Sequence, residues 1–75
     1  MTATASSHLL SVQVNGETRR IPVGCTIALM LRELGIVPER VAVERNREIV
    51  PRSTLDDVAV NDGDAFEIVH FVGGG

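Results

Sequence analysis

The chain has 75 residues, a net charge of −3 and a pI near 5.2, and its seven basic residues are all arginines. A chain of this length forms one small domain, which hides only ~60% of the surface that its unfolded form exposes. Because the arginines are scattered along an acidic chain, a nucleic-acid interface, which needs a clustered basic face, is disfavoured. The sequence contains no lysine, so this protein has no side-chain amine to which another copy could be joined by an isopeptide bond.

The single cysteine, Cys25, cannot form an internal disulfide, and together with two separated histidines it cannot supply the four ligands of a structural zinc site. No segment approaches the ~20 apolar residues of a membrane span. Residues 1–8 are predicted to be a disordered leader that lacks the features of a signal peptide. We therefore expect a cytoplasmic protein that binds no membrane and is a monomer when free.

The first predicted elements form a hairpin. In residues 10–14 every second residue is apolar, which indicates a strand with one buried face. Asn15-Gly16 tolerates positive φ at both positions, as a tight type I′ turn requires. A second strand should return through Ile21 to Val23, and the proline between these two residues predicts that it lies at a sheet edge.

A short helix follows the hairpin. Thr26 is a suitable N-cap, Ile27, Leu31 and Leu34 are spaced to share one helix face, and Gly35 stands where a left-handed C-terminal cap belongs. A helix this short is held only by tertiary packing.

Three further strands are predicted after the helix, separated by segments rich in turn-forming residues. The strands cover residues 41–44, 48–50 and 65–72, with turns at 46–47 and 61–64 and an irregular or helical turn over 53–58. A helix that crosses between the hairpin and the later strands lets the first and last strands lie parallel at the sheet centre. The sequence thus predicts an α+β, ubiquitin-like β-grasp fold, a mixed sheet of about five strands packed on one main helix, over residues 9–72.

The last three residues, 73–75, are glycines that follow directly on a predicted central strand and should form a flexible tail. Glycines leave no Cβ to obstruct entry into a narrow channel, and three extended residues reach roughly 10 Å. A terminal carboxylate is a poor electrophile and needs activation, for which ATP adenylation is the obvious route. We interpret the α-carboxylate of Gly75 as the working group, rather than reading the glycines as a frayed end or an expression remnant.

The chain resembles the ThiS family of sulfur carriers of thiamin biosynthesis, within the ubiquitin-like ThiS/MoaD superfamily. The resemblance runs from Leu10 to Gly75, and its landmarks are Thr26 opening a leucine-rich helix and the segments 41–43, 49–52, 62–64 and 73–75. The related molybdopterin carriers usually have a proline pair before the glycines, where this chain has Phe71 and Val72.

The resemblance implies a non-enzymatic carrier that binds no cofactor itself. An E1-like, ThiF-type enzyme is expected to adenylate Gly75 with ATP and magnesium, and a cysteine desulfurase or another sulfur donor to complete the thiocarboxylate. Thiazole synthase of the ThiG type would then receive the sulfur. Alternatives are a sulfur carrier for molybdopterin or cysteine, a ubiquitin-like modifier of other proteins, and a ubiquitin-like interaction module with an idle tail.

The last strand carries apolar side chains on both faces. We assign Phe66 and Ile68 to the core, and Val69 and Phe71 to an outer face that docks a partner, with Val72, Gly73 and Gly74 continuing the contact. The alternative is that loops or the leader cover Val69 and Phe71.

Two other groups have competing interpretations. Cys25 precedes the predicted helix, whose dipole would lower the pKa of the thiol and favour a thiolate or persulfide carrier, but a small residue filling a turn is the simpler interpretation. Asp62 and Asp64 flank one glycine and lack the further ligands that calcium requires, so a turn is expected there.

Overall fold

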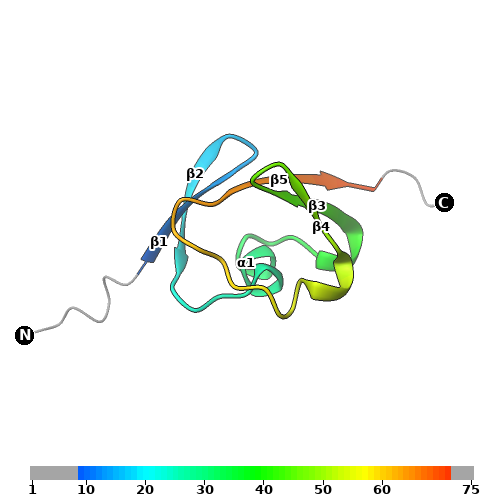
Figure 1. Ribbon diagram of the computed structural model, residues 1–75, viewed down its shortest axis with the longest axis horizontal. Helices are drawn as coiled ribbons and strands as arrows, with labels where there is room; N and C mark the ends of the chain where they lie inside the picture. The colour runs from blue at the N-terminus through cyan, green and yellow to red at the C-terminus, as the bar shows by residue number, and fades with distance from the viewer. Residues whose placement is uncertain (1–8, 72–75) are drawn as a thin grey trace, which may run out of the picture.

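The computed structural model describes residues 9–71, which form a five-stranded sheet packed on one α-helix (Figure 1). The strands are β1 (Leu9–Val14), β2 (Glu17–Pro22), β3 (Val41–Arg45), β4 (Glu48–Val50) and β5 (Ala65–His70); the helix is α1 (Ile27–Glu33), and the 3₁₀ turns are η2 (Pro38–Arg40) and η3 (Arg52–Thr54). None of the helices within residues 9–71 is long and apolar enough to cross a membrane.

The strand order is β2-β1-β5-β3-β4, with β5 in the middle of the sheet. β1 and β5 run parallel, whereas the other neighbouring pairs are antiparallel. Helix α1 lies on one side of the sheet, and the connection from η3 to β5 passes around it (Figure 1). This arrangement confirms the predicted ubiquitin-like β-grasp fold.

The β1–β2 hairpin turns at the residues that the sequence indicated. Asn15 and Gly16 have φ values of 51° and 86°, so both occupy the left-handed region that a type I′ turn requires. The strand β2 pairs only with β1 and so lies at the sheet edge, as its proline predicted.

Four contacts stabilise the N-terminus of the short helix α1. The Oγ1 of Thr26 accepts a hydrogen bond from the backbone N–H of Leu29 at 3.2 Å, which confirms the predicted N-cap. The preceding N–H groups of Ile27 and Ala28 donate to the carbonyls of Val58 and Leu55, both at 2.9 Å, and Thr26 also forms an isolated bridge with Ala59. The segment after η3 therefore satisfies the first amides of α1.

The core lies between α1 and one face of the sheet. Fourteen buried apolar residues fill it: Val12, Val14, Ile21, Cys25, Ile27, Ala28, Met30, Leu31, Val41, Val43, Leu55, Val60, Phe66 and Ile68. Phe66 is the largest of the fully buried side chains, so the predicted core assignment of Phe66 and Ile68 agrees with the structure.

Strand β5 is shorter than the sequence predicted. We expected the strand to run from Ala65 to Val72, but it ends at His70, opposite Val41, the first residue of β3. The residues before Val41 form the 3₁₀ turn η2, so Phe71 has no strand residue opposite it. Its backbone N–H nevertheless donates to the carbonyl of Arg40 at 3.0 Å, one hydrogen bond beyond the regular ladder.

Candidate functional site

The predicted site residues fall into two groups. Val72, Gly73, Gly74 and Gly75 lie outside the described residues, so their assigned roles stay predictions. Val69 and Phe71 are described, and they lie at the end of β5 from which the chain continues to the glycines. The site is therefore built from this end of β5 and the surface around it.

The outer face of the sheet is apolar close to this end. Val69 is 61% exposed and pairs with Ala42 of β3, while Phe71 is 54% exposed. Ile49 of β4 is 76% exposed on the same face. We call Ala42, Ile49, Val69 and Phe71 the outer patch. Among the described residues, the loops leave both side chains more than half exposed, with Arg52 of η3 lying over one face of the Phe71 ring. The leader, residues 1–8, lies outside the described residues, so the alternative that it covers Val69 and Phe71 stays open.

The outer patch is bordered by acidic residues on the side away from Phe71. Glu44 and Glu67 lie directly opposite each other across β3 and β5, and Ile49 is the cross-strand neighbour of Glu44. Two like charges in directly opposed positions are unfavourable for the sheet. Across β3 and β5 the outer face thus changes from acidic to apolar in the direction in which β5 runs, while Ile49 of the patch lies beside Glu44.

Two asparagine side chains from turns form hydrogen bonds with the backbone of β5. The Oδ1 of Asn46 accepts from the N–H of Ala65 at 3.0 Å, where the strand begins. The side chain of Asn15 bridges the middle of the strand, because its Oδ1 accepts from the N–H of Ile68 at 2.7 Å and its Nδ2 donates to the Ile68 carbonyl at 3.2 Å. Backbone pairing of β1 with β5 has ended at Phe66, so Asn15 takes the place of a further strand residue.

The turn before β5 contains a buried carboxylate that the sequence analysis missed. Asp64 is 5% exposed and accepts hydrogen bonds from the Nδ2 of Asn46 at 3.1 Å and from the N–H of Asn61 at 2.9 Å. The Nε of Arg45 lies 3.4 Å from Oδ2, the carboxylate oxygen that also accepts from Asn61. Turn composition predicted the turn itself, but no local pattern indicates that Arg45, 19 positions earlier, would neutralise this aspartate.

Asp62 also has a structural partner, since its Oδ1 accepts from the N–H of Ser11 at 2.8 Å. Gly63 between the two aspartates has φ +87°, as the tight turn requires. Over residues 9–71, no three His, Cys, Asp or Glu side chains gather closely enough to hold a metal ion. The two aspartates therefore organise the turn in front of β5.

The structure contradicts a low pKa for Cys25. Burial, with a smaller contribution from the negative charge of Glu33, raises the pKa of the thiol above its ordinary value. The amides of Ile27, Ala28 and Leu29 at the helix start already donate to other groups, so they are not available to stabilise a thiolate. Cys25 belongs to the buried core, as the interpretation of a small residue filling a turn predicted.

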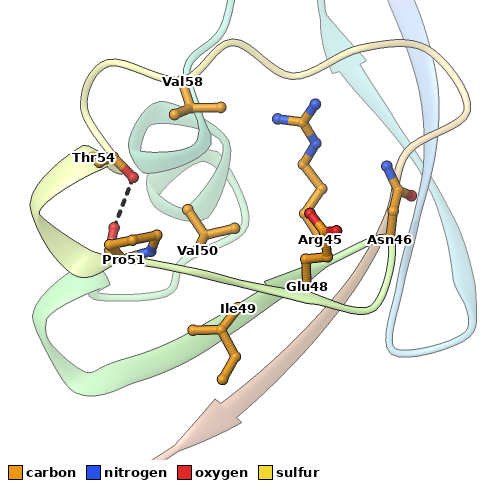
Figure 2. A pocket seen from close by; sticks show the side chains of 8 residues that line it. All are labelled: Arg45, Asn46, Glu48, Ile49, Val50, Pro51, Thr54 and Val58. Atoms are coloured by element: carbon orange, nitrogen blue, oxygen red, sulfur yellow. Dashed lines mark hydrogen bonds between the residues drawn. The ribbon is translucent and has the colours of Figure 1, made fainter.

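A surface hollow of about 430 Å³ lies along β4 and shares Ile49 with the outer patch. Figure 2 shows its lining, with Ile49 and Val50 from β4, Arg45 from β3 and Thr54 from η3. The Oγ1 of Thr54 donates to the Pro51 carbonyl at 2.8 Å, and Arg45 is engaged with Asp64. The lining residues form no pair of nucleophile and base, so the hollow offers no arrangement for covalent catalysis.

Comparison with known proteins agrees with this geometry. The sequence profile of the ThiS family matches residues 12–75. The crystal structure of the thiamine biosynthesis protein ThiS from Geobacter metallireducens superposes with a TM-score of 0.72 at 33% identity, covering 88% of this chain and 100% of that one.

Two curated relatives differ greatly in length. The sulfur carrier protein ThiS of Bacillus subtilis is 44% identical over 50 residues, which are 67% of this chain and 76% of that protein. A thiazole synthase of Paramagnetospirillum magneticum is 52% identical over 66 residues, 88% of this chain, but the chain spans only 20% of that protein's length. The profile match across most of the chain, the shared fold and these identities lead to one conclusion: the chain belongs to the ThiS family.

Proposed function

We propose that this protein is a sulfur carrier of thiamin biosynthesis whose reactive group is the α-carboxylate of Gly75. The observation that carries the proposal is the position of β5, which is the middle strand of the sheet and which only Phe71 and Val72 separate from the glycines in the sequence. The sulfur carrier ThiS of Bacillus subtilis, at 44% identity, supports the same role. The proposal requires that Gly75 ends the mature chain.

The chemistry begins with activation of the carboxylate and continues with displacement of the activating group by sulfur. A carboxylate oxygen attacks the α-phosphorus of ATP, with magnesium bound by a partner enzyme of the E1-like ThiF type, and pyrophosphate leaves. A sulfur nucleophile then attacks the carbonyl carbon of the acyl adenylate and expels AMP. If the donor is the persulfide of a cysteine desulfurase, the acyl disulfide that forms must be cleaved by a second thiol to release the thiocarboxylate.

The thiocarboxylate is a good sulfur nucleophile, and its covalent attachment keeps the sulfur from diffusing away as sulfide. Thiazole synthase of the ThiG type is the proposed acceptor. Support comes from the thiazole synthase of Paramagnetospirillum magneticum, which contains a segment 52% identical to residues of this chain. The carrier itself needs no acid or base groups in this scheme, because the partners supply them.

The outer patch is the proposed docking surface for the adenylating enzyme. It presents exposed Val69 and Phe71 next to the point where the chain leaves the fold, so a partner bound there would lie within reach of the tail. Gly73 and Gly74 would occupy the narrow channel that leads to the partner's active site, with Val72 at its entrance.

Intact-mass analysis of the protein isolated from its native cells tests the proposal. The expected result is a fraction of molecules heavier by the exchange of one oxygen for sulfur, with the change located on Gly75 by fragmentation. A chain that carries permanent residues after the glycines, or sulfur located on Cys25, would contradict it.

A variant lacking Gly74 and Gly75 is the matched control. The variant keeps all the described residues, 9–71, so we expect it to unfold at the same temperature as the wild type but to accept no sulfur. Incubation with lysine-containing proteins separates a modifier from a carrier, because only a modifier yields conjugates of higher mass.

A further inference from the structure

Phe71, the last described residue, is held by two segments that are distant in sequence. Its backbone N–H donates to the carbonyl of Arg40 at 3.0 Å. The guanidinium carbon of Arg52 lies 4.9 Å from the centroid of the Phe71 ring, within the range of a cation–π contact. The Nη1 of Arg52 also donates to the carbonyl of Glu39 at 3.2 Å. Turns η2 and η3 therefore both hold the end of β5.

These contacts contribute little to the hydrophobic core. Arg52 is exposed and Phe71 is 54% exposed, and neither belongs to the buried cluster between α1 and the sheet. What the contacts fix is the orientation of one residue, four positions before Gly75. The guanidinium is suited to this task because its planar group stacks on the ring while a separate N–H reaches the Glu39 carbonyl.

The orientation of Phe71 matters once a partner holds the following residues extended, as the proposed channel requires. Four residues span roughly 13 Å when extended, so a change of about 30° in chain direction at Phe71 displaces the far end by about 7 Å. Reaction rates fall steeply when a reacting group is displaced by even ~1 Å.

We propose that Arg52 is a positioning residue: by stacking on Phe71 and bonding to Glu39, it sets the direction in which the chain leaves the fold toward Gly75. This inference rests on the proposed carrier function for its effect on rate. Its effect on Phe71 is a property of the free protein and can be measured without any partner.

The first test is NMR of the free protein. Arg52→Gln removes the charge and the stacking group, so the backbone and ring of Phe71 should become more mobile, with a lower heteronuclear NOE at its amide. Arg20→Gln is the matched control, because Arg20 is exposed on the edge strand β2 and the charge change is the same. In a Phe71→Leu background, Arg52→Gln should have no further effect, since its partner ring is already missing.

The second test is adenylation by the ThiF-type enzyme from the same cells. Arg52→Gln should lower kcat by about two- to five-fold, which is what an exposed cation–π contact corresponds to, with KM unchanged. Arg52→Lys, which keeps the charge and fits the space, should recover part of the rate. An unchanged Phe71 amide, or a rise in KM alone, overturns the inference, because Arg52 would then be idle or bind the enzyme directly. If the wild type is not adenylated at all, the carrier function fails, while the NMR result still decides whether Arg52 orders Phe71.

Discussion

Replacing Asn15 should destabilise the fold through two separable effects. The Asn15 side chain makes two hydrogen bonds to the backbone of Ile68, at 2.7 and 3.2 Å, and its own backbone has φ 51°. Asn15→Gly removes the hydrogen bonds but accepts the backbone conformation, so at about 1 kcal/mol for each bond it should cost about 2 kcal/mol. Asn15→Ala adds roughly 1 kcal/mol for a Cβ in the left-handed region, giving about 3 kcal/mol.

Urea unfolding of the wild type and both variants measures these differences. The slope of the free energy against urea should be unchanged, and each 1 kcal/mol should lower the melting temperature by about 4–8 °C. Hydrogen exchange gives a local check, because the Ile68 amide should exchange faster in both variants. The Val69 amide, which points toward β3 by the alternation of an antiparallel pair, should keep its protection at low urea. Equal stability of Asn15→Gly and wild type, with a protected Ile68 amide, would refute the reasoning.

Two further predictions concern the surface and the core. Val69→Asp should raise the KM of the adenylating enzyme about ten-fold by removing ~1.5 kcal/mol of apolar contact. It should also cost about 1 kcal/mol of stability, because it places a carboxylate in the central strand beside Glu67, so KM is measured where the variant is folded. Leu29→Asp on α1, also exposed, should leave KM unchanged; equal effects of the two on KM would exclude the outer patch as the docking surface. Burial raises the pKa of the Cys25 thiol, so the neutral thiol contributes fully to stability below about pH 9, and this contribution is lost as pH rises through the folded-state pKa. Urea titrations at about pH 7 and pH 10 should therefore show a larger loss of unfolding free energy for the wild type than for Cys25→Ala. Cys25→Ala should also still accept sulfur on Gly75, and a loss of sulfur transfer in a folded variant would show that the thiol takes part.

Local sequence patterns were sufficient where one residue determines one local conformation. The left-handed turn at Asn15-Gly16, the cap at Thr26 and the left-handed Gly35 after α1 all follow from the conformational preferences of the residues themselves. Alternation in β1 and β3 identified the buried faces, because a strand repeats every two residues.

The features that the sequence did not reveal depend on residues distant along the chain. The carboxylate of Asp64 is held by Arg45 and Asn46, and the first amides of α1 by carbonyls of Leu55 and Val58. Each of these contacts exists only once the sheet has closed around the helix. The less favoured alternative of a thiolate at Cys25 fails for the same reason, since a helix terminus favours a thiolate only when its amides have no other partner.

The end of β5 was misjudged for a related reason. Residues 65–72 keep the composition of a strand throughout, but a strand extends only as far as a neighbouring strand does. Here β3 begins at Val41 and η2 comes before it, so the regular ladder stops at His70. The sequence could not show this without knowing the register of β3 against β5.

Side chains from three separate turns contact β5. Asn46 forms a hydrogen bond at the start of the strand and Asn15 in its middle, and Arg52 makes a cation–π contact just past its end. The middle contact lies where β1 has stopped pairing, and the last lies where β3 has not yet begun. Side chains therefore replace backbone pairing at the places where the central strand lacks a neighbour. A strand that ended in solvent would need no such support, since water could satisfy its amides. The support is expected of a strand whose far end must hold the following residues in a defined place, as the proposed carrier function requires.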